Sequence, residues 1–500
     1  MLSFKTEDMK KLFYLLITVL VITSCDNGFE ELNVNPTKPV QVAVGTKLTA
    51  AQKFISSERY DNWRAGLIYQ STMMQHIAAT AGYWSGDKYT WNRGYASSLM
   101  DRYYGNAVKS LEDMLVQLDD EGAADEMKAI TRILRVFTFS RLTDLYGDIP
   151  YSEAGKGFTE GILKPKYDAQ SEIYPDLLKE LEESAAALGS GTSGFGAADV
   201  IYQGDQGKWK RLANSLMLRL GLRLIKVDPA AAQAWVTKAI AGGVMQSNDD
   251  IFYLRHEVTQ NRNGNSEVFD ADGNPRMSKT FIDFLQAGND PRLPILAARR
   301  GDQSTAPADL QGLPNGLDAA LLLASTGEVN TDAYAEPNRS ILAGFDAPMF
   351  FQTYAEVEFM LAEANVRWGL AGDAETHYNA GVTAAMKMLS LYGAGGDIPD
   401  VDITDYLTNN PYDAANALEQ INTQYWVATF LNEYETFANW RRTGFPVLVP
   451  VNYPGNETNG TIPRRLTYTE SEATNNADNY AAAIAAQGPD VLTTRVWWDQ

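Results

Sequence analysis

The sequence predicts a mainly α-helical fold with long irregular loops, and three observations support this prediction. Apolar residues recur at steps of three and four along much of the chain, which is the spacing of one face of an α-helix. Alternating runs typical of strands are sparse and short, and one segment has the signature of a helical repeat. A clear apolar stripe consists of Leu99, Tyr103, Ala107, Leu111, Met114 and Leu118.

The expected helices follow from this spacing in chain order. A long helical stretch is expected over about residues 46–80, where Phe54, Trp63, Leu67 and Met74 fall on one face. The stretch over residues 125–146 repeats the pattern. Further helices are expected over about residues 99–118, 173–188, 208–226, 229–242, 350–368 and 373–390.

The segment around residues 361–381 resembles a tetratricopeptide unit. Ala362 is small enough to let two helices approach, and Gly369 opens the turn between them. Ala374 and Tyr378 stand where the second helix of such a unit packs against the first, and Gly381 follows. Stacked repeats of this kind form a scaffold, and function then depends on the loops that the scaffold supports.

The composition excludes several classes of protein. Asp and Glu number 63 against 42 Lys and Arg, giving a formal net charge of −21. Nucleic-acid binding needs a basic face, so we expect no nucleic-acid partner. The single cysteine rules out an intrachain disulfide, and His76, His256 and His377 lie far apart. We therefore predict no metal site and no cofactor.

The first 24 residues have the features of a signal peptide. Lys10 and Lys11 precede an uncharged run of 12 residues, from Leu12 to Thr23. This run is too short to span about 30 Å of hydrocarbon but suits the core of a signal peptide. Residues 1–24 are therefore predicted to be a lipoprotein signal peptide.

Cys25 is the predicted site of lipidation. It is the only cysteine of the chain and follows the small residue Ser24, as in bacterial lipoproteins. A lipid on Cys25 would anchor the protein to a membrane without a transmembrane helix; the alternative is a free, unmodified cysteine. Residues 25–45 are then a lipidated N-terminus and tether, and residues 46–500 a single domain.

Motifs in order along the chain resemble the SusD/RagB family of outer-membrane lipoproteins of Bacteroidetes. The segments that carry this resemblance are Cys25-Asp26-Asn27, Phe29-Glu30-Glu31-Leu32-Asn33-Val34-Asn35-Pro36, Asp144-Leu145-Tyr146-Gly147-Asp148-Ile149-Pro150-Tyr151, Lys208-Trp209, Ala213-Asn214-Ser215-Leu216, Asn289-Asp290-Pro291-Arg292, Ala362-Glu363-Ala364, Asn439-Trp440-Arg441-Arg442-Thr443-Gly444-Phe445-Pro446, Pro463-Arg464-Arg465 and Arg495-Val496-Trp497-Trp498.

The resemblance implies a helical SusD-like fold with about four tetratricopeptide-like helix pairs. It also implies a nutrient-capture lipoprotein, lipid-anchored in the cell outer membrane and exposed at the surface. Such proteins cover a SusC-like TonB-dependent transporter and deliver glycan oligomers, or in some members peptides, to it. The acidic residues after Cys25 agree with a surface-export signal in these bacteria.

The loop over residues 82–94 is the first candidate for ligand binding. It contains Tyr83, Trp84, Tyr89 and Trp91 among three glycines, with a spacing that fits no helix. Flat aromatic rings beside polar groups suit the apolar faces and hydroxyl rims of sugars. The alternative is that Tyr83 and Trp84 fold back onto the core and leave only Trp91 exposed.

Residues 252–274 are the second candidate, with Arg262 and Asn263 as potential hydrogen-bonding groups. A solvated polar loop is the alternative. Residues 270–274 imitate the start of a calcium loop, but the glutamate that an EF-hand requires is missing, and a lone surface calcium ion is the alternative. A third loop-rich stretch spans residues 301–347, with Tyr334 and Asn338 as candidates.

An enzyme is the less favoured interpretation. A glycosidase needs two carboxylates at a set separation, but Glu356, Glu358 and Glu363 lie on an expected repeat helix, where a solvated face or pairing with Arg367 is favoured. No nucleophile elbow, phosphate loop or dinucleotide motif stands in a fitting context. We therefore predict a glycan-binding protein without catalytic residues; peptide capture and a surface hydrolase are the alternatives.

Overall fold

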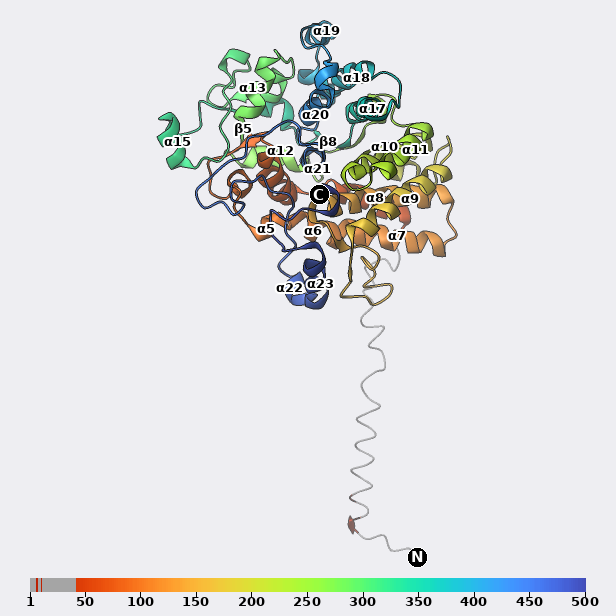
Figure 1. The fold of residues 1–500 in the computed structure, drawn as a ribbon. Helices are drawn as coiled ribbons and strands as arrows, with labels where there is room; N and C mark the ends of the chain where they lie inside the picture. Colours follow the sequence, from red (N-terminus) through yellow and green to blue (C-terminus); the bar gives the residue numbers. More distant parts are fainter. Residues whose placement is uncertain (1–5, 8–9, 11–41) are drawn as a thin grey trace, which may run out of the picture. The chain divides into compact units, whose positions relative to one another are not determined.

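The computed structural model describes residues 6, 7, 10 and 42–500 of the chain (Figure 1). Residues Val44–Gln500 form one compact unit. Cys25 and nearly all of the predicted signal peptide and tether lie outside the described residues, so these assignments stay predictions. Within the part that is described, no helix combines the length and the hydropathy needed to cross a bilayer.

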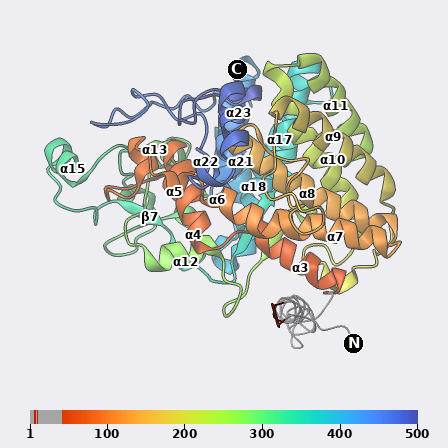
Figure 2. The ribbon, with the colours of Figure 1, turned by 90° about the horizontal axis from the view of Figure 1, so that it is seen from below.

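Four helix pairs form the scaffold, which confirms the predicted fold class. In each pair the two helices contact one another. Successive pairs are joined by contacts of α9 with α10, α10 with α17 and α17 with α20. Figures 1 and 2 both show α7 to α11 as one layered stack. The pairs are α8 (Asp125–Tyr146) with α9 (Gln170–Ala187), α10 (Gln206–Arg223) with α11 (Pro229–Gly242), α17 (Tyr354–Trp368) with α18 (Ala374–Lys387), and α20 (Ala417–Ala428) with α21 (Glu433–Thr443).

Further helices surround this scaffold. The other α-helices are α3 (Val44–Ile55), α4 (Arg59–Asp61), α5 (Arg93–Ala96), α6 (Ser98–Arg102), α7 (Lys109–Asp120), α12 (Gly264–Ala271), α13 (Lys279–Ala287), α14 (Leu293–Leu296), α15 (Ala319–Thr326), α16 (Arg339–Leu342), α19 (Asp400–Asn409), α22 (Glu472–Asn475) and α23 (Ala477–Gln487). Two π-helices are η1 (Asn62–Ser71) and η3 (Tyr103–Val108). The 3₁₀ turns are η2 (Ser85–Lys88), η4 (Gly196–Ala198), η5 (Leu224–Lys226), η6 (Asn248–Asp250), η7 (Pro307–Asp309), η8 (Met388–Tyr392), η9 (Ala394–Gly396), η10 (Ala414–Asn416) and η11 (Trp497–Asp499).

Strands are short, as the sequence predicts, and those of the described residues pair only two by two. All four pairs are antiparallel. They are β1 (Ile77–Ala78) with β5 (Arg276–Met277), β2 (Ile149–Pro150) with β3 (Tyr167–Asp168), β4 (Phe252–Arg255) with β8 (Pro348–Gln352), and β6 (Ala297–Arg299) with β7 (Ala335–Pro337).

The repeat signature is confirmed in α17 and α18. Helix α17 begins with a capping box in which Thr353 and Glu356 satisfy each other's backbone N–H groups. It ends at Gly369, whose φ of +67° favours glycine. A Cβ atom at Gly381 would lie 2.6 Å from the Phe359 ring, so the missing side chain lets the two helices approach.

The prediction of one long helix over about residues 46–80 is wrong, because the structure divides this stretch into α3, α4 and η1. Ser57 has a φ of +62° and lies between α3 and α4. Because a left-handed residue cannot continue a right-handed helix, the apolar stripe is interrupted there. The π-helix η1 then changes the residue spacing.

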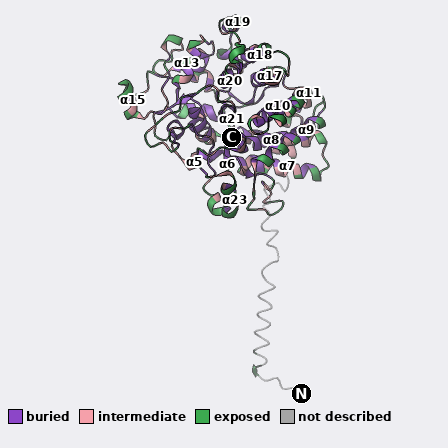
Figure 3. Cartoon of the chain, in the orientation of Figure 1, coloured by how far each residue is buried: buried purple, intermediate pink, exposed green. Residues whose placement is uncertain are grey.

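Figure 3 shows buried residues throughout the scaffold helices and exposed residues at their outer turns. The core also holds charged side chains. Glu356, Glu358 and Glu363 are all less than 10% exposed, so the expectation of a solvated face for them is wrong. Glu363 accepts hydrogen bonds from Arg442 at 2.6 and 2.7 Å and, as the sequence suggests, from Arg367 at 2.7 Å.

We expect Glu363→Gln to lower stability and to reduce the acid sensitivity of the fold. The arginines hold the pKa of Glu363 at about 2, below its ordinary 4.5, although burial opposes this shift. A depressed folded-state pKa adds stability above about pH 4.5, and that stability is lost as the pH falls toward about 2. Breaking a buried ion pair costs about 3–5 kcal/mol at neutral pH. Urea unfolding at several pH values measures both effects.

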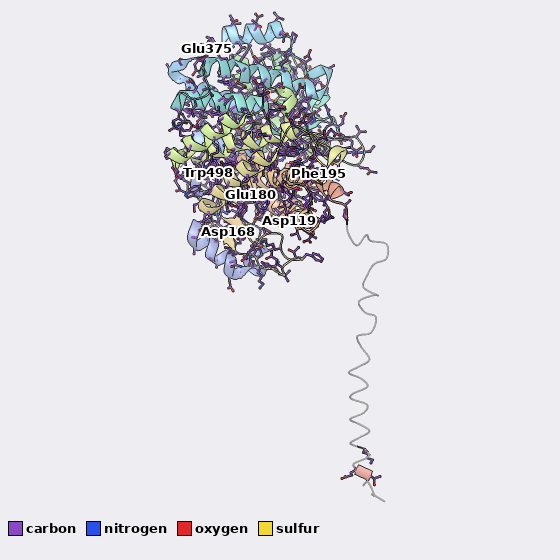
Figure 4. All side chains as sticks on the ribbon, turned by 90° about the vertical axis from the view of Figure 1, so that its right-hand side faces the viewer. Asp119, Asp168, Glu180, Phe195, Glu375 and Trp498 are labelled. Atoms are coloured by element: carbon purple, nitrogen blue, oxygen red, sulfur yellow. The ribbon has the colours of Figure 1, made fainter. Side chains whose placement is uncertain are left out.

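The matched control is Glu375→Gln on α18, since Glu375 is exposed at the surface (Figure 4). Its unfolding free energy should equal that of the wild type at neutral pH. Equal stabilities for Glu363→Gln and Glu375→Gln would contradict the structural role assigned to Glu363.

Candidate ligand-binding site

Four aromatic side chains gather on one surface, and we call them the aromatic face: Tyr60, Trp63, Tyr83 and Tyr95. They come from α4, η1, the loop before η2 and α5; of these, α4 and η1 contact α12, and Figure 2 shows α4 next to α12. Tyr60 is 53% exposed and Tyr83 37% exposed, and the other two rings are partly buried. Exposed aromatic rings grouped in this way are a feature of binding sites.

Trp63 lies at the centre of the aromatic face. Its ring centroid is 6.2 Å from that of Tyr60, 5.7 Å from that of Tyr83 and 6.2 Å from that of Tyr95. The Trp63 and Tyr83 rings meet edge to face at 67°. These separations are typical of attractive aromatic pairs, so each ring is held by its neighbour.

One carboxylate orients the aromatic face from beneath. Asp272, which follows α12 and is 7% exposed, accepts hydrogen bonds from the Trp63 indole at 3.1 Å and the Trp84 indole at 3.3 Å. The Tyr83 hydroxyl donates to the same carboxylate at 2.9 Å. The two segments that the sequence predicts for ligand binding, residues 82–94 and residues 252–274, therefore meet at Asp272.

Asn274 completes this cluster. Its side-chain amide donates to the Tyr83 hydroxyl oxygen at 2.7 Å and to Asp272 at 2.7 Å. Burial and the hydrogen bond to the Asp272 carboxylate raise the pKa of Tyr83 to about 12. The Tyr83 hydroxyl is consequently protonated at neutral pH and fixed in direction.

Arg64 supplies a charged group beside the rings. Its guanidinium carbon lies 5.2 Å from the Tyr60 ring centroid and 5.3 Å from that of Tyr95, which are cation–π distances. Among the described residues, the guanidinium makes no ion pair or hydrogen bond. Arg64 is therefore available to donate hydrogen bonds to a bound molecule.

We expect Asp272→Asn to disturb the aromatic face as a whole. An amide keeps one acceptor oxygen and places N–H donors against the indole N–H groups, so buried donors lose their partner. The expected cost is about 1–3 kcal/mol of unfolding free energy, with a changed near-ultraviolet circular dichroism of the tryptophans. Asp270→Asn, at an exposed position two residues away, should change neither quantity; equal behaviour of the two variants would contradict the orienting role.

Trp84 and Tyr89 do not lie on the surface, and the expectation that they offer exposed rings is wrong. Trp84 is 0% exposed and Tyr89 is 1% exposed. A Cβ atom at Gly86 would lie 2.3 Å from the Ile68 carbonyl oxygen, so the loop is pressed directly onto η1. Both rings therefore belong to the core.

The buried carboxylate of Asp87 also fixes the loop over residues 82–94, through residues that are distant in sequence. Asp87, which is 1% exposed, accepts hydrogen bonds from the Asn315 side chain at 2.5 Å and the Gly316 backbone at 3.0 Å. Its carboxylate lies 3.6 Å from the Lys88 ammonium. This long-range pairing holds Trp84 and Tyr89 inward.

Trp91 lies apart from the aromatic face. Its indole N–H donates to Thr467 at 2.9 Å, and the Arg93 guanidinium stands 4.3 Å above its ring centroid. The ring is partly buried against the core. One face of Trp91 is thus covered by Arg93.

Arg262 and Asn263 are not brought to the aromatic face. Asn263 is buried and caps α12 by accepting from the Ser266 backbone at 3.1 Å. Arg262 is exposed and stacks on Phe345 at 4.4 Å. Tyr334 and Asn338 of the third candidate stretch are 1% and 2% exposed, respectively. The structure thus places only Tyr83, among the predicted ligand-binding residues, on the aromatic face.

Sequence reasoning missed Tyr60, Trp63 and Tyr95 as surface residues. Trp63 fits the apolar stripe of an uninterrupted helix, but the structure breaks that helix at Ser57 and places Trp63 in the π-helix η1. Asp272 could have been noticed in the calcium-like segment, but its carboxylate is bonded to aromatic donors. In the described part of the chain, no cluster of three potential metal-ligating side chains is found.

Comparison with known proteins shows which family has this architecture. The model of a SusD-like family, described as starch-binding and associating with the outer membrane, matches residues 36–469. A solved chitin-binding protein is 33% identical, covers 92% of this chain and 100% of its own, and has a TM-score of 0.83. The search of curated proteins returned no match.

Two further solved structures agree. A SusD-like protein described as Bacteroidetes AC2a is 26% identical and covers 92% of this chain and 100% of its own, with a TM-score of 0.81. A chitin-binding SusD homologue from Flavobacterium johnsoniae is 26% identical and covers 91% of this chain and 98% of its own, with a TM-score of 0.76. The helical-repeat scaffold with its irregular loops is therefore of the SusD type. The chain belongs to the SusD-like family.

Proposed function

We propose that this protein captures glycan oligomers on the aromatic face, with β-linked N-acetylglucosamine oligomers as the favoured class. The observation that carries the proposal is the set of exposed rings around Trp63, oriented by Asp272. Sugar rings present apolar C–H faces that lie flat on aromatic rings. Two similar solved proteins are described as chitin-binding, which supports this class of sugar.

The polar groups around the rings complement the rim of a sugar. Arg64 donates hydrogen bonds, and the Tyr83 hydroxyl and the Asn274 amide lie next to one another at 2.7 Å. Hydroxyl and acetamido groups can both exchange hydrogen bonds with such side chains. A peptide ligand is the alternative. Calorimetric titration with both glycans and peptides distinguishes the two ligand classes.

We propose capture and hand-off as the mechanism. The protein holds the oligomer without changing it and delivers it to a SusC-like TonB-dependent transporter in the outer membrane. A lipid on Cys25 keeps the protein at the membrane surface, where tethering raises the effective concentration of captured ligand beside the transporter. The outer-membrane association of the family supports this location.

Calorimetric titration of the purified full chain tests the proposal. The probes are hexamers of N-acetylglucosamine, β-linked glucose and α-linked glucose, together with a pool of peptides, and each sample is analysed for cleaved products. We expect the N-acetylglucosamine hexamer to bind most tightly and to be recovered intact. Binding of peptides alone would move the ligand class to peptides, and cleaved products would overturn the binding-protein interpretation.

A further inference from the structure

A pocket lies between α13, α19 and α20, which contribute nothing to the aromatic face; Figure 1 shows these helices at the top of the molecule. Its volume is about 520 Å³, within the range of about 300–1,000 Å³ that small-molecule sites occupy. Three aromatic residues line it, together with amide, hydroxyl and carboxylate side chains. The pocket therefore has the composition of a binding site.

The floor of the pocket contains a tyrosine hydroxyl with a fixed direction. Arg292 is held by Asp290 and donates to the Gln424 carbonyl oxygen at 2.8 Å. Since arginine has only donors, Gln424 must turn its N–H₂ group the other way, and it donates to the Tyr406 oxygen at 2.8 Å. The Tyr406 oxygen thus accepts from Gln424, and its own proton points away from that amide.

A second hydroxyl on the floor has no partner. Tyr378 is 1% exposed and lines the pocket, yet among the described residues its hydroxyl makes no hydrogen bond. Burial raises the pKa of Tyr378 above its ordinary value and that of Tyr406 to about 12, so both hydroxyls are donors at neutral pH. The Tyr378 hydroxyl lies on the lining of the pocket, so its proton is available to an acceptor atom of a bound molecule.

The rim supplies acceptors and an apolar wall. Asp413 and Glu419 are exposed carboxylates at the mouth, and the Thr423 hydroxyl makes no hydrogen bond with any described residue. Phe284 and Val447 form apolar surface on the wall. Hydroxyl-rich molecules with one apolar face match this combination, whereas the carboxylates repel anions.

We propose that this pocket binds a short uncharged saccharide, a monosaccharide or disaccharide, separately from the aromatic face. The Tyr378 and Tyr406 hydroxyls donate to sugar oxygens on the floor. The Asp413 and Glu419 carboxylates accept from sugar hydroxyls at the mouth, and the C–H face of the sugar lies along Phe284. The two sites share no residue, so the pocket does not depend on the function proposed above.

The test is saturation-transfer NMR on the full chain with N-acetylglucosamine, glucose, their β-linked disaccharides and the anionic sugar glucuronic acid. Gly288→Leu fills the pocket, because a Cβ at this position would lie 3.4 Å from the Tyr406 ring and 3.5 Å from the Asn410 oxygen, with a permissive φ of −85°. Gly105→Leu, at an exposed helical glycine with nothing within 4 Å of its Cβ position, is the matched control.

We expect at least one uncharged sugar to bind and glucuronic acid not to bind. In the Tyr83→Ala background, which removes a ring of the aromatic face, Gly288→Leu should abolish the remaining signal, and Tyr378→Phe, which removes only the hydroxyl, should weaken binding by about 3–10-fold. Gly105→Leu and Tyr83→Ala should retain it. The proposal is overturned if no uncharged sugar binds, if Gly288→Leu binds as the wild type does, or if Tyr83→Ala rather than Gly288→Leu removes binding.

Discussion

The double variant Tyr60→Ala, Tyr83→Ala is expected to lose glycan-oligomer binding by about 100-fold while its melting temperature stays close to that of the wild type. Tyr60 and Tyr83 are the most exposed rings of the aromatic face, at 53% and 37%. Each ring is expected to contribute about a tenfold factor in affinity, or about 1.4 kcal/mol. Calorimetric titration with the N-acetylglucosamine hexamer measures the loss.

Phe158→Ala is the matched control for the double variant. Phe158 is a large exposed aromatic residue at 92% exposure and is not part of the aromatic face. We expect its affinity for the hexamer to equal that of the wild type. Unchanged affinity in the double variant would remove the aromatic face as the capture site, whereas an equal loss in Phe158→Ala would show that the effect is not local.

Trp84→Ala is expected to destabilise the fold strongly, by about 3–5 kcal/mol. The indole is 0% exposed and donates to Asp272 at 3.3 Å, so the substitution leaves a cavity and removes one of the donors that hold the carboxylate. The expected result is a clearly lower midpoint in urea unfolding. The sequence alone leaves both placements of Trp84 open, because an exposed ring would tolerate truncation and a ring folded back onto the core would not.

Trp84→Phe separates packing from hydrogen bonding. It retains most of the ring volume and loses only the indole N–H, so we expect a smaller cost, about 1 kcal/mol. Trp91→Ala is a second comparison, because Trp91 is only partly buried. If Trp84→Ala unfolds at the same urea concentration as the wild type but no longer binds glycans, the ring is a ligand contact and its placement in the core is wrong.

Local patterns in the sequence are sufficient for the scaffold. The apolar stripe of residues 125–146 corresponds to α8, and the small residues around Gly369 and Gly381 correspond to the turn and the close contact of α17 and α18. Each of these features depends on neighbours within a few turns of helix. Periodicity therefore predicts the element type even where the ends differ by several residues.

The candidate site could be predicted only in part, because its contacts are distant in sequence. The loop over residues 82–94 is glycine-rich and aromatic, and this indicates a special segment. Which rings face inward depends on Asn315 and Gly316, more than 200 residues away, which bind Asp87. Asp272 likewise reaches Trp63 across 209 positions. Composition and spacing contain no information about such partners.

The burial of charged side chains could not be predicted from the sequence for the same reason. Glu356 and Glu363 look like members of a solvated helix face because glutamate is usually exposed. Their partners Arg219 and Arg442 lie on α10 and α21 and become neighbours only through the stacking of the helix pairs. A buried acid is recognised only when the cation that compensates it is known.

A crystal structure of the chain with the N-acetylglucosamine hexamer bound shows directly whether the aromatic face is the capture site. We expect sugar rings to lie on Tyr83 and Tyr60, next to Trp63, with the Arg64 guanidinium donating to a sugar oxygen and with Asp272 still bonded to Trp63. An oligomer found elsewhere on the protein, with the four rings of the aromatic face uncovered, would contradict the assignment of this surface as the capture site.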